Sequence, residues 1–554
     1  MNGIKKEFKQ GNGRRWLMMA VLCLFGFCLV AQQPRTSTAR QPKSKVYLLH
    51  ADVLKKNKQN PDAQILVGDV EFRHDSIYMY CDSAYFYEKT NSLEAFANVR
   101  MVQGDTLFLY GDHLFYDGDA QLAQIRNNVR MENRTITLTT DSLNYDRVAN
   151  LGYFFDGGTL MDQENVLTSD WGEYSPATKM SVFNYEVKLV NPQFTLTSDT
   201  LRYNTATKVA NIVGPSDIHS EDNHIYSELG FYDTFHGQAQ LLDRSVLTNG
   251  ARRMTGDSLF YDRNRGLGEA FGAVELLDTA GHNMLTGDYC HYNQFSGYAF
   301  ATDKAMAVDF SQGDSLFIHA DTLQLFTFHM GTDSVSREAR AFHKVRFYRA
   351  DVQGVCDSLV FASKDSCLTM YRDPILWNNN QQLLGEEIYV YMNDSTIERA
   401  HIHNQALSVE RIDSVCYNQV AGKDMKAFFK GGEMDRIDVI GSVRVVYYPM
   451  EKDSTLIGMN VSETSQLTIY LQNRKLKRMV MSPKSSGTLY PMSLIPEKKR
   501  QLENFAWFDY IRPVSKEDIF NWRGKQAGQE LKKSVRGAAP LPNRNLFENN
   551  RKEE

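Results

Sequence analysis

The chain has 554 residues, of which 42% are hydrophobic and 12% aromatic, and its formal net charge is −5. So small a charge, without a basic stripe, argues against a nucleic-acid partner. The sequence has no G-x-S-x-G, H-E-x-x-H or P-loop motif, so we expect neither an enzyme nor a cofactor.

The first 32 residues have the pattern of a secretory signal. Lysines and arginines are frequent among the first 15 residues, and an apolar run from Trp16 to Ala31 follows them. A run of about 16 residues is short for a membrane span. We therefore predict a cleaved signal peptide at residues 1–32 and a polar linker at 33–45, with a retained membrane anchor as the alternative.

Residues 46–490 consist of variations on one motif, which TGDSLFYDRNRGLGEAFGAVELLD (255–278) represents well. The residue before its acid is always small, and the residues two and four places after the acid are mostly apolar or aromatic. The position between those two is mixed, and this period of two predicts a strand with one buried face. The acid recurs every 29 to 36 residues, at Asp82, Asp112, Asp141, Asp170, Asp199, Glu228, Asp257, Asp288, Asp321, Asp357 and Glu386.

An apolar residue also recurs three places before the acid, as Met254 does before Asp257. Positions five apart lie on opposite faces of a regular strand, so something must switch the parity between them. We predict a bulge or sharp bend at the step from the small residue to the acid, with the carboxylate accepting local backbone N–H bonds. A metal ladder or catalytic row is the alternative, but no partner ligand recurs with the acid.

A second strand-like half follows each motif, as GEAFGAVEL (268–276) shows, so one repeat is a hairpin. About a dozen such hairpins predict an all-β, elongated antiparallel stack. At two strands per repeat and ~4.7 Å per strand, the stack would be on the order of 110 Å long.

The character of the chain changes after the repeats. Residues 491–523 are rich in aromatic residues among charged ones, and we expect a short helix (497–505) leading into an apolar hook that caps the last strand. A docking peptide for a partner is the alternative. The polar residues 524–554 are predicted to be disordered.

The cysteines and two neighbouring histidines give weaker evidence about function. Five cysteines remain after the signal, and we interpret them as structural, with a bridge between Cys356 and Cys367 as an optional extra. His401 and His403 lie on one strand face and could bind a metal, but no third ligand is evident nearby. We therefore favour exposed strand histidines and predict no metal site.

The repeated G-D-S-L-x-Y-D followed by A-x-G-x-V-x-L resembles the OstA-like (organic solvent tolerance) family. That family includes the periplasmic bridge protein of lipopolysaccharide transport and the periplasmic domain of the outer-membrane lipopolysaccharide translocon. The resemblance covers residues 46–420 well and 421–490 loosely, with more repeats than the short bridge proteins have. It implies a β-jellyroll, or β-taco, whose apolar interior takes lipid acyl chains.

The resemblance also implies a location and partners. We expect a periplasmic protein, with association with the outer membrane as an option, that carries lipopolysaccharide. Other transport jellyrolls would join it end to end by strand addition, with a homo-oligomer as a further option. A structural or adhesive β-solenoid with a closed core is the alternative, and ordinary core packing is the alternative for each lining residue. The residues expected to line the lipid groove are Leu114, Tyr116, Leu143, Tyr145, Leu201, Tyr203, Leu259, Tyr261, Leu323 and Leu359.

Overall fold

A computed structural model describes residues 44–531, except 57–60, 221–222, 312, 394–396, 432, 452, 454, 473–474 and 530. The predicted signal peptide and most of the predicted disordered tail lie outside this part of the chain. Among the described residues, no helix has the length and apolar character needed to cross a membrane.

The described chain is all-β and antiparallel, as predicted, and forms a β-jellyroll. It divides into two compact units, one of residues 1–105 with 110–124 and the other of residues 106–109 with 125–554. The chain passes between the units within strands β6 (Leu107–Asp117) and β7 (Leu122–Asn133). The number of repeats stays a prediction.

In the first unit, β3 is the central strand of the N-terminal hairpins, because it pairs with β1, β2 and β4. A 3-10 turn, Glu88–Thr90, links β4 to β5. The strands of this unit are β1 (Tyr47–His50), β2 (Val53–Lys56), β3 (Gln64–His74), β4 (Ile77–Tyr87) and β5 (Ser92–Gln103).

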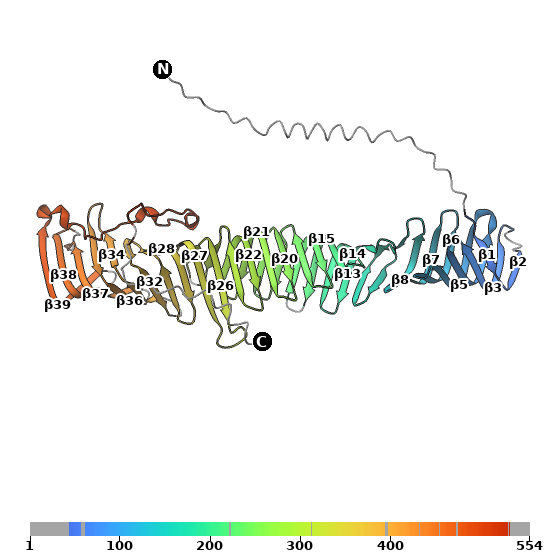
Figure 1. Ribbon diagram of the computed structural model, residues 1–554, viewed down its shortest axis with the longest axis horizontal. Coiled ribbons are helices and arrows are strands. Elements are labelled where there is room, and N and C mark those ends of the chain that lie inside the picture. Colours follow the sequence, from blue (N-terminus) through green and yellow to red (C-terminus); the bar gives the residue numbers. More distant parts are fainter. Residues whose placement is uncertain are drawn as a thin grey trace, which may run out of the picture. The chain divides into compact units, whose positions relative to one another are not determined.

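The strands of the second unit follow one another in chain order, and Figure 1 shows them from β8 to β39. They are β8 (Ile136–Asp146), β9 (Leu151–Phe154), β10 (Gly158–Asp162), β11 (Asn165–Ser169), β12 (Trp171–Tyr174), β13 (Met180–Asn191), β14 (Phe194–Asn204), β15 (Val209–Ser220), β16 (Asn223–Asp233), β17 (Gln238–Leu242), β18 (Val246–Asn249), β19 (Arg252–Thr255), β20 (Ser258–Asp262), β21 (Leu267–Asp278), β22 (Asn283–Asn293), β23 (Tyr298–Thr302), β24 (Met306–Asp309), β25 (Leu316–His319), β26 (Thr322–Phe328), β27 (Ser336–Tyr348), β28 (Val352–Ala362), β29 (Cys367–Tyr371), β30 (Ile375–Asn378), β31 (Gln381–Leu384), β32 (Glu387–Met392), β33 (Ile397–His403), β34 (Ala406–Arg411), β35 (Tyr417–Gly422), β36 (Asp424–Lys430), β37 (Glu433–Tyr447), β38 (Gly458–Gln472) and β39 (Lys475–Pro491).

The predicted change of parity is present, but the extra residue lies on the neighbouring strand and not at the step from the small residue to the acid. In the β13–β14 ladder, Asn184 pairs with Thr200 and Val187 pairs with Ser198, so two residues face the single Asp199. In most of these bulges both residues have left-handed backbone, with φ near +40° to +86°, whereas in the Gly214–Pro215 bulge of β15 only Gly214 has positive φ. The left-handed pairs include Gly68–Asp69, Ala97–Asn98, Tyr185–Glu186, Gly272–Ala273, His343–Lys344 and Gly441–Ser442.

The small residue before the acid has a hydrogen-bonding role at this bend. The hydroxyl of Ser198 donates to the carbonyl oxygen of Thr200 at 2.9 Å, and Ser169 and Ser227 make the same bond two residues ahead. A small side chain also leaves room for the neighbouring strand, because a Cβ at Gly287 would come 2.8 Å from a backbone oxygen of Thr302.

The acid itself contacts side chains of the bulges, where we had predicted backbone N–H partners. Asp82 accepts a hydrogen bond from Asn98 at 2.7 Å. Asp288 pairs with Lys304 at 2.9 Å in the same way. Asp82 and Asp288 therefore lie on the outside of the bend and bind a left-handed residue further along the chain.

The residues that follow the last strand cover an outer sheet face of the second unit, and we call residues 495–525 the strap. It contains 3-10 turns and no longer helix, so the predicted helix at 497–505 is wrong. Phe508 and Ile511 of the strap are buried against Val355, Trp377 and Leu407. The 3-10 turns after β39 are Met492–Leu494, Glu497–Lys499, Asp509–Ile511 and Asp518–Phe520.

Three buried glutamines of the sheet hold the strap by its backbone or side chains. Gln382 accepts from the N–H of Phe508 at 2.8 Å and donates to the carbonyl of Ala506 at 2.9 Å. Gln419 bonds the backbone of Arg500 and Leu502 in the same manner, and Gln353 accepts from the guanidinium of Arg512. The strap explains why residues on both faces of β28, β30, β31 and β34 are buried.

Candidate functional site

The structure places all ten predicted groove residues inside the jellyroll. Each of them is at most 6% exposed, and they fill the interior as packed core side chains. Their burial agrees with the predicted inner face, but whether they contact lipid stays a prediction. They are Leu114, Tyr116, Leu143, Tyr145, Leu201, Tyr203, Leu259, Tyr261, Leu323 and Leu359.

Along one side of the second unit, two rows of hairpin turns approach each other, and we call the line between them the seam. One row contains the turns after the repeated tyrosine, such as 204–208, and the other contains the turns at the far strand ends, such as 162–165. Most side chains that bond across the seam belong to residues 38 to 46 positions apart in the sequence, and Asn165 and Thr234 lie 69 apart.

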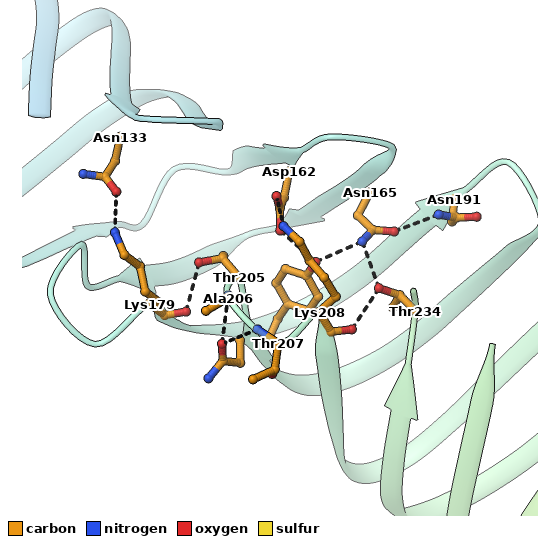
Figure 2. Close-up of polar contacts among 12 residues, drawn as sticks. Asn133, Asp162, Asn165, Lys179, Asn191, Thr205, Ala206, Thr207, Lys208 and Thr234 are labelled. Carbon is orange, nitrogen blue, oxygen red and sulfur yellow. Dashed lines mark hydrogen bonds and ion pairs between the residues drawn. The ribbon is translucent and has the colours of Figure 1, made fainter. Parts of the chain in front are cut away.

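The most buried set of contacts across the seam is centred on Asp162 (Figure 2). Asp162 is fully buried. The hydroxyl of Tyr203 donates to Asp162 at 2.8 Å, and the ammonium of Lys208 forms an ion pair with the same carboxylate. Asn165 donates to the hydroxyls of Tyr203 at 2.9 Å and Thr234 at 3.0 Å. A buried carboxylate needs such partners, because burying it unpaired is costly.

Other layers close the seam with different polar residues. Lys179 donates to Asn133 at 2.8 Å, as Figure 2 shows, and Tyr174 donates to the same amide oxygen at 3.2 Å. Asn223 donates to the hydroxyl of Tyr261 at 3.0 Å. The first unit has a similar contact, because the imidazole of His74 lies 2.6 Å from the hydroxyl of Tyr116.

The seam tyrosines are held as neutral hydroxyls. Burial raises the pKa of Tyr145 and of Tyr232 to about 12. Burial, and then the charge of Asp162, raises the pKa of Tyr203 as well. The tyrosines therefore act as hydrogen-bonding groups at the edge of an apolar interior, and nothing in their arrangement suggests a nucleophile or base.

A cavity of about 670 Å³ lies near the C-terminal end of the repeats. Residues of β31 and of the strands from β34 to β39 line it. Its volume lies in the usual range for small-molecule sites. Its apolar wall includes Met425, Ile437, Ile469, Leu471 and Met479. Its polar wall includes Gln381, Glu410, Asn418 and Glu451.

Sequence reasoning missed these cavity residues, since the ten predicted positions all come from the well-formed repeats. One signal was available in residues 422–483, where the strand rhythm continues but Ser465 stands opposite the bulge of β37 in place of the acid. A looser motif allows larger departures from close packing, and most of the residues that line the cavity, from Met425 to Met479, belong to this stretch.

The cysteines and histidines named from the sequence have clear positions. All five described cysteines are free and buried, so the optional bridge between Cys356 and Cys367 is absent. His401 and His403 lie on the outer face of β33, and the structure brings Asp424 beside them. A third potential ligand, which the sequence did not reveal, therefore comes from β36.

Comparisons with known proteins give a family match for one part of the chain. Residues 43–199 match the family model described as OstA-like protein. No curated protein sequence matches the chain.

Several solved structures share some likeness with the chain. One of them is the crystal structure of LptH, the LptA homologous periplasmic component of the conserved lipopolysaccharide transport device from Pseudomonas aeruginosa. The two are 17% identical over 21% of this chain and 94% of LptH, with a TM-score of 0.20. That score is too low for the likeness to bear on this chain's function.

Proposed function

The chain is OstA-like over residues 43–199, and from this premise we propose that it is a periplasmic bridge for lipopolysaccharide. It takes up the acyl chains of the lipid in the interior of its β-jellyroll and passes them toward the outer membrane. The observation that carries this proposal is the cavity of about 670 Å³ between the inner strand faces.

The cavity suits acyl chains better than a phosphorylated headgroup. Each CH₂ that leaves water for an apolar wall gains about 0.8 kcal/mol, and Ile437, Ile469 and Met479 supply such a wall. The carboxylates of Glu410 and Glu451 would repel a phosphate in the same space. The headgroup is therefore expected to stay outside, with the chains inserted.

Transport beyond the cavity needs the packed layers to open. From β8 to β22 the tyrosine recurs in every repeat, and a leucine stands two places before it in alternate repeats. Acyl-chain positions of similar free energy would therefore recur along the interior. The polar contacts across the seam oppose entry, but each is a small set of hydrogen bonds that water or a headgroup can replace. The seam is thus the side at which a chain enters a filled layer.

Strand edges would give the bridge its partners. Among the described strands, β39 pairs only with β38, and β1 and β2 pair only with β3. The N-terminal edge exposes Tyr47, Leu49 and Leu54, which are 46–55% exposed. An unpaired edge with apolar side chains is suited to strand addition by another transport jellyroll.

Photocrosslinking in cells tests the proposal with neighbouring residues of one strand. A benzophenone amino acid at Ile469, which lines the cavity, is compared with one at Tyr470, which is 37% exposed on the outer face of β38. We expect lipopolysaccharide adducts at Ile469 and none at Tyr470. Crosslinkers at Leu259 and at Arg202 are compared in the same way. This second comparison tests whether the filled layers also open.

The outcomes separate the two functional hypotheses. Adducts at Ile469 alone would confine lipid to the cavity, and adducts at Ile469 and Leu259 would support passage along the interior. A folded, exported protein without adducts at either inner position would overturn the proposal and favour a closed structural solenoid.

A further inference from the structure

A group of two histidines and one aspartate lies on the outer face of the second unit, away from the interior and the seam. His401 and His403 are two residues apart on β33, so their side chains leave the same face of the strand. Strand β33 pairs with β36, with Ile402 opposite Met425. This register places Asp424 next to His403.

The potential ligand atoms of the three residues converge. Nδ1 of His403 lies 2.6 Å from Oδ1 of Asp424, and Nε2 of His401 lies 3.7 Å from the same oxygen. All three ligand atoms fit within 4.8 Å of one another. Nε2 of His401 is also shielded from solvent and has no hydrogen-bond partner in the described structure.

We propose that His401, His403 and Asp424 form a binding site for a divalent transition-metal ion of the zinc class. Zinc binds imidazole nitrogen and carboxylate oxygen at about 2.0 to 2.2 Å, so tetrahedral ligand atoms lie roughly 3.3 Å apart. The separations of 2.6 and 3.7 Å lie on either side of that value. The shielded nitrogen of His401 gains a partner when the ion binds.

One neighbouring residue supports metal binding at this site and another opposes it. The backbone N–H of Asn404 donates to Oδ1 of Asp424 at 3.3 Å and helps to orient the carboxylate. Lys426 stands directly across the ladder from His401, and its charge opposes a bound cation. Three protein ligands leave one position open for water or an incoming ligand.

A second cluster, Asp217, His219 and His224, has the same composition and provides a control. Its two imidazole rings are stacked, with centroids 4.3 Å apart and an interplanar angle of 8°. The ligand atoms of this cluster also lie within 4.8 Å of one another. Stacked rings direct their nitrogen lone pairs along parallel planes, however, so the lone pairs do not point at one ion. The rings of His401 and His403 are instead inclined by 74°.

Zinc titration of the purified full-length protein tests the site. The protein is stripped of metal and titrated with Zn²⁺ against a chromogenic zinc chelator, and Co²⁺ is then used to report tetrahedral geometry by its visible absorption. We expect one tight Zn²⁺ per chain. Affinity should fall by about 100-fold or more in His401→Ala and Asp424→Asn, since loss of a second-shell partner alone costs 10- to 100-fold.

Control variants fix the interpretation. The double variant His219→Ala with His224→Ala should bind Zn²⁺ as the wild type does, and Lys426→Met should bind it more tightly. Melting temperatures without metal should match the wild type, and Zn²⁺ should raise them only where the site is intact. Wild-type affinity in both His401→Ala and Asp424→Asn, or loss of binding in the control alone, would overturn the proposal.

Discussion

The buried aspartate of the seam shows how single residues close the jellyroll. Asp162 is fully buried and depends on Tyr203 and Lys208 for its hydrogen bonds. Removing a partner from a buried polar group costs about 1–3 kcal/mol. Removing a single hydrogen-bonding atom at the seam should therefore change the free energy of unfolding measurably.

We predict that Tyr203→Phe lowers the free energy of unfolding by about 1–3 kcal/mol, because Asp162 and Asn165 each lose the phenolic oxygen. Urea denaturation measures the effect. Tyr185→Phe is the matched control, since Tyr185 is 67% exposed and should change stability by less than about 0.5 kcal/mol. Equal effects in both variants would contradict the role given to the seam.

The buried tyrosines also predict how stability depends on pH. The pKa of Tyr145 and of Tyr232 is raised by burial from 10.0 to about 12. The unfolded chain therefore ionises first, so their contribution is complete below pH 10 and is lost as the pH rises toward 12. Urea midpoints should fall across this window, and less steeply in the double variant Tyr145→Phe with Tyr232→Phe. An unchanged slope in that variant would be evidence against this assignment.

At the scale of the strand, left-handed backbone at the bends limits which residues fit. Gly272 has φ of +71°, and a Cβ there would lie 2.3 Å from Oδ2 and 2.9 Å from Cβ of Asp257. Gly157 has φ of +78°, but a Cβ there would meet nothing within 4 Å. Both glycines need a positive φ, but only at Gly272 would an added Cβ also collide with a neighbouring side chain.

We predict that Gly157→Ala costs about 1–2 kcal/mol, the usual cost of a left-handed L-residue, and that Gly272→Ala costs clearly more. Thermal or urea unfolding measures both. Adding Asp257→Ala to Gly272→Ala should bring the cost back to that of Gly157→Ala, since it removes the colliding carboxylate. If the double variant is no more stable than Gly272→Ala, the collision does not explain the loss.

The strap depends on the glutamines that bind its backbone. We predict that the double variant Gln382→Ala with Gln419→Ala releases it, because four buried or half-buried backbone groups lose their partners. Limited trypsin digestion followed by mass spectrometry should show faster cleavage after Arg500. Gln466→Ala, on an exposed part of β38, is the control, and equal cleavage in both proteins would show that apolar burial alone holds the strap.

The sequence allowed the strand order and the change of parity to be predicted, because both depend on side chains that recur every repeat. It did not place the extra residue on the neighbouring strand. The left-handed pair is Tyr185–Glu186 in one repeat and His343–Lys344 in another, so backbone geometry recurs there without a common side chain. Asp424 was missed as a metal ligand for a related reason, since it meets His403 only through the register of β33 with β36.

At the scale of the whole molecule, unpaired strand edges raise the question of self-assembly. Strand β39 carries the C-terminal edge of the second unit, and β2 lies at an edge of the first. Addition of β39 from one copy to β2 of another is a head-to-tail contact, and such contacts propagate into open chains when the rotation does not close. Homo-oligomers of this kind should therefore grow with protein concentration.

Cysteine trapping tests this contact directly. All five described native cysteines are buried, and burial raises the pKa of the Cys81 and Cys290 thiols to about 12, so background reactivity should be low. We predict that Ser486→Cys on β39, mixed with Lys55→Cys on β2, gives covalent dimers under mild oxidation, because paired strands bring Cα atoms within disulfide reach. Ser486→Cys mixed with Arg202→Cys, which is not on an edge strand, should give none. Equal yields in the two mixtures would mean that these edges do not pair with each other and that strand addition is reserved for a different jellyroll.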